Sequence, residues 1–166
     1  LILVEPPKRP LIPLATILVA GCATFGWSGR DTLSTTVGVP ADTALRVAST
    51  QLQHHGYTVS DISGSEVITV PRRVPQYLLP LSTNSEEAAE LAERQLILTV
   101  RVQPAPYSAG SRVDVTGYLV PLATKGATNM VMEDAILITE ENNPTLYREV
   151  RAAAGWISDA LRRQEK

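Results

Sequence analysis

The sequence contains little of what most catalytic and metal sites are built from. It has one cysteine and two histidines among 166 residues, and aromatic residues make up 5% of the chain. A single cysteine excludes an internal disulfide, and so few cysteines and histidines leave too few ligands for a zinc site. The scarcity of aromatic side chains also disfavours a surface on which sugar rings would stack.

The charge is nearly balanced, with 15 lysines and arginines against 17 aspartates and glutamates, for a formal net charge of −2. A nucleic-acid surface would be basic and patterned, so we expect no nucleic-acid partner. The hydrophobic fraction of 44% is typical of a globular chain rather than a disordered one. The length is sufficient for one domain with one core.

An apolar stretch near the N-terminus ends in the only cysteine of the chain. Lys8 and Arg9 precede it, and residues 11–22 read LIPLATILVAGC. Its uncharged part is shorter than the roughly 20 apolar residues that a transmembrane helix needs. A basic region, an apolar region and small residues, in this order, are typical of a signal peptide for secretion.

The end of this stretch resembles the lipobox of bacterial lipoproteins, with the residues Val19-Ala20-Gly21-Cys22. The resemblance implies cleavage before Cys22, which removes residues 1–21, and it implies diacylglycerol and a fatty acyl chain on Cys22, with no other cofactor. Aspartate after the cysteine tends to retain such lipoproteins in the inner membrane. Here Ala23 follows, which favours the outer membrane, facing the periplasm. The alternative is a disordered or core-packed apolar N-terminus in which Cys22 is an ordinary buried thiol.

Hydrophobic periodicity in the remaining chain predicts a single α+β domain over residues 35–163, after a flexible spacer over 22–34. The two main helices are expected over 41–52, ended by Gly56, and over 144–163, capped by Asn143. A short helix is expected over 86–94. Strands are expected over 35–39, 57–62, 66–70, 96–102 and 112–120, with one further strand or buried connector over 135–139.

This order of elements predicts an antiparallel sheet of about five strands with two main helices packed on one face. Together with the junction Leu52…Gly56-Tyr57 between the first helix and the next strand, it resembles the helix-grip domains of envelope lipoproteins. One such protein is the C component of the outer-membrane β-barrel assembly machinery. The resemblance implies a helix-grip-like fold and transfers no functional residue.

One surface feature suggests a docking site. Two adjacent arginines precede an apolar segment in which prolines prevent a long regular element. The residues of this candidate docking surface are Arg72, Arg73, Tyr77, Leu78, Leu79 and Leu81. A partner would bind the apolar anchor inside a rim of charge, and the prolines would limit the entropy lost on binding. The alternative is a loop that folds back over the sheet and buries its leucines.

The remaining polar patterns have structural interpretations. His54 and His55 are adjacent on a helix, so their side chains point about 100° apart and do not converge on one metal ion. The acidic run over 86–93 indicates a solvated helix face rather than the paired carboxylates of a glycosidase. Arg101 and Asp114 are predicted to lie near each other across two strands, a pair that contributes roughly 0.2–1 kcal/mol.

We therefore expect a non-enzymatic envelope lipoprotein that acts as an interaction or accessory subunit of an envelope assembly. Its expected contacts are the membrane, through the lipid on Cys22, and an envelope protein partner, with no metal. The alternative function is a small apolar-ligand carrier of helix-grip type, in which the sheet curls around the C-terminal helix and leaves a cavity.

Overall fold

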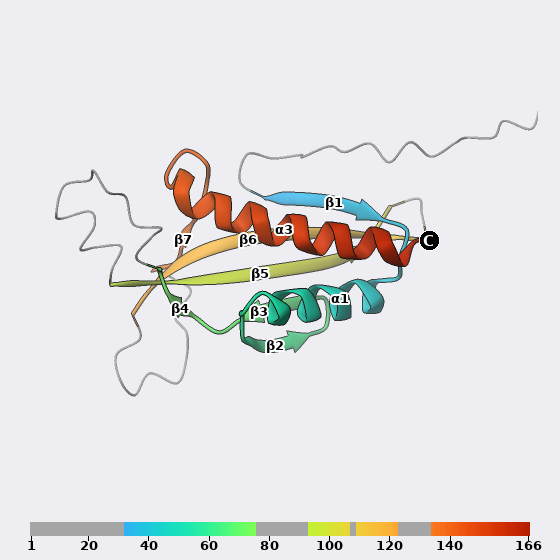
Figure 1. Cartoon of the computed structure of the whole chain (residues 1–166), viewed down its shortest axis with the longest axis horizontal. Helices are drawn as coiled ribbons and strands as arrows, with labels where there is room; N and C mark the ends of the chain where they lie inside the picture. Colours follow the sequence, from blue (N-terminus) through green and yellow to red (C-terminus); the bar gives the residue numbers. More distant parts are fainter. Residues whose placement is uncertain (1–31, 76–92, 107–108, 123–133) are drawn as a thin grey trace, which may run out of the picture.

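The computed structural model describes residues 32–75, 93–106, 109–122 and 134–166. Two helices and seven strands lie in these ranges (Figure 1). They are β1 (Leu33–Val37), α1 (Ala41–His54), β2 (Val59–Ser63), β3 (Glu66–Thr69), β4 (Arg72–Arg73), β5 (Arg94–Pro104), β6 (Ser111–Pro121), β7 (Ile136–Leu137) and α3 (Pro144–Gln164).

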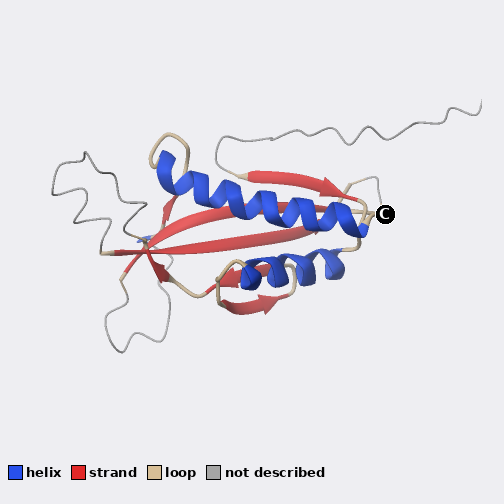
Figure 2. Cartoon of the chain, viewed as in Figure 1, coloured by secondary structure: helices blue, strands red, loops and turns tan. Residues whose placement is uncertain are grey.

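The seven strands form one antiparallel sheet in the order β1-β6-β5-β3-β2 (Figure 2). The short strand β4 pairs with β5, and β7 pairs with β6. The predicted α+β class is confirmed. The sheet has seven strands rather than about five. β7 lies within residues 135–139, for which a further strand was one alternative, and β4 has two residues, too few to show a periodic pattern.

Both helices pack on the same face of this sheet, which we call the inner face; the opposite one is the outer face. Alternate residues of β5 point to the inner face and have no exposed surface: Leu96, Leu98, Val100 and Val102. They share one core cluster with the buried residues of α1 and α3. Each such side chain contributes roughly 1.5–3 kcal/mol when it is buried.

The ends of the two helices follow the predicted signals. Gly56 adopts φ 82°, and the Tyr57 N–H donates to the Leu52 carbonyl at 2.9 Å, which closes the C-terminus of α1. At the start of α3, the Asn143 side chain accepts a hydrogen bond from the backbone N–H of Leu146 at 3.0 Å. Neither helix, within the described residues, has the combination of length and apolar character that crossing a membrane requires.

Several predicted boundaries are wrong. β1 spans Leu33–Val37 rather than residues 35–39, because Leu33 pairs with Val115 and is buried. β2 begins at Val59, two positions after the predicted start of that strand. The helix predicted over 86–94 does not reach Arg94, which is the first residue of β5 and pairs with Pro121. The other residues of that predicted helix, up to residue 92, lie outside the described ranges.

α3 lies close to the sheet at Gly117 of β6. A Cβ atom added there would lie 2.4 Å from Val150 Cγ2 and 3.2 Å from Ile138 Cδ1. Val150 and Ile138 are each 1% exposed. The space between α3 and the sheet is therefore filled at this point, and only glycine permits the observed helix-to-sheet contact.

We predict that Gly117→Ala destabilises the protein by about 1–3 kcal/mol, because the added methyl group overpacks a filled core. Chemical denaturation measures the change. Gly155→Ala is the matched control: Gly155 lies in α3, nothing is within 4 Å of its added Cβ, and alanine should stabilise the helix by roughly 0.5–1 kcal/mol. Equal stability of Gly117→Ala and the wild type would contradict this packing.

Candidate functional site

The structure describes two of the residues predicted to form the docking surface. Arg72 and Arg73 form β4 and pair with Leu96 and Gln95 of β5. The other residues, namely Tyr77, Leu78, Leu79 and Leu81, lie outside the described ranges, as does Cys22.

A one-residue insertion in the strand edge beside β5 determines where the two arginines point. Ile68 of β3 pairs with Thr99, and Arg72 of β4 pairs with Leu96, so three intervening residues oppose two on β5. Such a bulge reverses the faces of all residues that follow it. Arg72 consequently shares the inner face with Leu96, although Ile68, four residues earlier, shares the outer face with Thr99.

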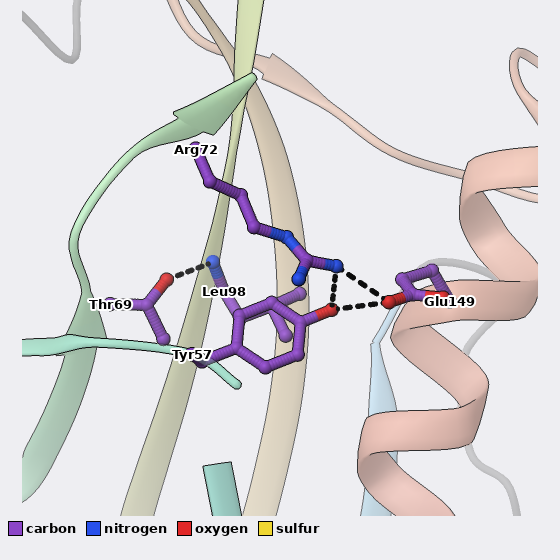
Figure 3. A network of polar contacts seen from close by, with 5 residues as sticks. All are labelled: Tyr57, Thr69, Arg72, Leu98 and Glu149. Atoms are coloured by element: carbon purple, nitrogen blue, oxygen red, sulfur yellow. Dashed lines mark hydrogen bonds and ion pairs between the residues drawn. The ribbon is translucent and has the colours of Figure 1, made fainter. Parts of the chain in front are cut away.

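At the bulge, a side chain replaces one of the backbone hydrogen-bond acceptors of the sheet. Thr69 has no exposed surface, and its Oγ1 accepts the Leu98 N–H at 2.9 Å (Figure 3). The Val70 N–H donates instead to the Thr58 carbonyl at 2.7 Å, and Pro71 has no N–H to satisfy. The extra residue therefore leaves neither Leu98 nor Val70 with an unpaired amide.

On the inner face, Arg72 joins Tyr57 and Glu149 in a compact group that we call the Arg72 cluster. Arg72 Nη2 donates to the Tyr57 hydroxyl and contacts Glu149 Oε1, both at 2.7 Å (Figure 3). The Tyr57 hydroxyl donates to the same Glu149 oxygen at 2.6 Å. The guanidinium also lies over the Tyr57 ring, with Cζ 3.9 Å from the ring centroid.

The cluster joins three separate elements. Tyr57 follows the glycine that ends α1, Arg72 belongs to β4, and Glu149 lies in the first half of α3. Tyr57 is 3% exposed, whereas the side chains of Arg72 and Glu149 are 30% and 18% exposed. The ion pair is thus partly screened by water, and the cluster connects β4 to the helical layer.

Arg73 lies on the outer face and is exposed. No hydrogen bond or ion pair joins its side chain to another of the described residues. The two adjacent arginines therefore do not form one charged rim: Arg72 makes an internal contact of the fold, and Arg73 is exposed on the opposite face of the sheet.

The outer face has a charged half and an apolar half. At the charged half, Asp114 is opposite Arg101 in the predicted register, but the ion pairs are different from the predicted pair. Arg101 contacts Glu66 at 3.6 Å, and Arg112 contacts Asp114 at 2.9 Å. Asp114 also accepts a hydrogen bond from Ser34 of β1. The cross-strand register was predictable, whereas the ionic partners lie elsewhere: on β3 for Arg101 and on β6 itself for Asp114.

In the apolar half of the outer face, near β4, the central side chains are buried. Ile97 is 0% and Val120 is 2% exposed, although both helices lie on the inner face. Neither residue belongs to the core cluster. Val70, between β3 and β4, is 40% exposed, whereas Val74, after β4, is buried in the core. The large hydrophobic residues that are exposed in the described part of the chain are Ile62, Val70, Leu122 and Ile136.

The histidine pair takes part in a contact that the sequence did not predict. The His55 ring stacks on Trp156 of α3 with centroids 3.7 Å apart and an interplanar angle of 6°. His54 meets His55 edge-on at 5.1 Å. Over the described ranges, no group of three or more histidine, cysteine, aspartate or glutamate side chains is arranged to hold a metal ion. The His55 side chain therefore forms a packing contact between the C-terminal end of α1 and α3.

No protein-family model matches the chain, and no curated protein matches it significantly.

We predict that Arg72→Met destabilises the protein by about 1.5–3 kcal/mol, because Glu149 and Tyr57 lose a charged hydrogen-bond donor. Arg73→Met is the matched control on the adjacent residue and should change the unfolding free energy by less than about 0.5 kcal/mol. Urea denaturation of the two variants measures the difference. Equal effects would show that the Arg72 cluster does not stabilise the domain.

Proposed function

We propose that this protein is a lipid-anchored component of the bacterial cell envelope, where it acts as a non-enzymatic interaction subunit. The observation that supports the anchor is the stretch over 11–22, in which an uncharged apolar run ends in Ala20-Gly21 and the only cysteine. Acylation of Cys22 gives an otherwise free thiol a function in an exported protein.

The position of β1 is compatible with such an anchor. β1 begins at Leu33, and the eleven residues from Cys22 to that point span at most about 40 Å when fully extended. A domain on this tether would stay close to the bilayer, and the anchor would be one or more acyl chains rather than a transmembrane helix. The outer membrane, facing the periplasm, is the location that we propose.

The proposed docking surface consists of Arg73 and four apolar residues that follow β4 in the sequence, namely Tyr77, Leu78, Leu79 and Leu81. Arg73 is exposed, lies on the outer face, and has no ionic partner among the described residues. Arg72 anchors the same strand to α3 through Glu149 and so limits the movement of β4. A short, anchored strand next to an apolar segment costs a partner little ordering entropy on binding. We propose a protein of the same envelope compartment as that partner.

The alternative function, a carrier of a small apolar ligand, is not supported by the packing at the centre of the sheet. It requires a cavity between the sheet and the C-terminal helix. Gly117 and Val150 instead meet so closely that no side chain larger than hydrogen fits between them. We therefore retain the interaction subunit as the proposal.

For the anchor, we expect Cys22→Ser to shift the protein from the membrane fraction to the soluble or unprocessed fraction, because the acceptor for the lipid is lost. Fractionation of cells that express the full chain, followed by immunoblotting, measures the shift. Ser34→Ala, a change in the folded domain, is the control and should leave the protein in the membrane fraction. Retention of Cys22→Ser in the membrane, with the same apparent mass as the wild type, would contradict acylation.

For the docking surface, we expect a photoreactive residue at position 78 to give a discrete crosslinked product in intact cells. Arg73→Glu should reduce that product roughly tenfold, because a reversed charge at an interface slows association and repels the original partner. Arg151→Glu is the matched control, since Arg151 is an exposed arginine on α3. A product that is equally sensitive to both reversals, or to neither, would argue against docking beside Arg73.

A further inference from the structure

We draw no further inference here: the strongest candidate, the apolar half of the outer sheet face around Ile97 and Val120, is buried on the side away from both helices, and nothing in the described part of the structure shows what covers it.

Discussion

The pairing of β5 with β6 is the constraint on which the rest of the described structure depends. These two strands are aligned from Arg94 opposite Pro121 to Pro104 opposite Ser111, and this register assigns each of their side chains to one face. The inner face receives both helices, which contact each other: α1 packs over β5 and β3, and α3 packs over β6 and β1 (Figure 1). β1 pairs with the other edge of β6, and β3 pairs with the other edge of β5. A shift of one residue between β5 and β6 would turn the buried side chains of one strand to the opposite face.

The bulge between β3 and β4 interrupts this regular alternation, as does a shift of register in β2 between Val59 and Asp61, and it has the larger consequence for the candidate site. It turns Arg72 toward Tyr57 and Glu149 and leaves Arg73 on the outer face. Because of this one inserted residue, Arg72 makes an internal contact and the adjacent Arg73 carries an exposed charge. The contacts of Arg72 hold β4 in place, and in the proposed function Arg73 is the exposed charge of the docking surface.

Sequence patterns predicted the elements that repeat over several turns or residues and missed those that depend on distant partners. The faces of β5, the glycine that ends α1 and the cap at Asn143 follow from local periodicity and backbone chemistry, and the structure confirms them. The Arg72 cluster joins Tyr57 to Glu149, 92 residues away, and no spacing in the sequence encodes that contact. Pro71 was the one local sign of an irregular strand, because proline in a sheet favours a bulge or an edge. Cys22 and the leucines over 78–81 remain predictions.

The central proposal is that Cys22 becomes the acylated N-terminus of the mature protein. Intact-mass and peptide mass spectrometry of the native protein from its own membranes tests it most directly. A lipid-anchored protein would begin at Cys22 and carry a mass increment for diacylglycerol, with or without an amide-linked fatty acid. A chain that still contains residues 1–21 and an unmodified thiol would contradict the anchor and, with it, the proposed location in the envelope.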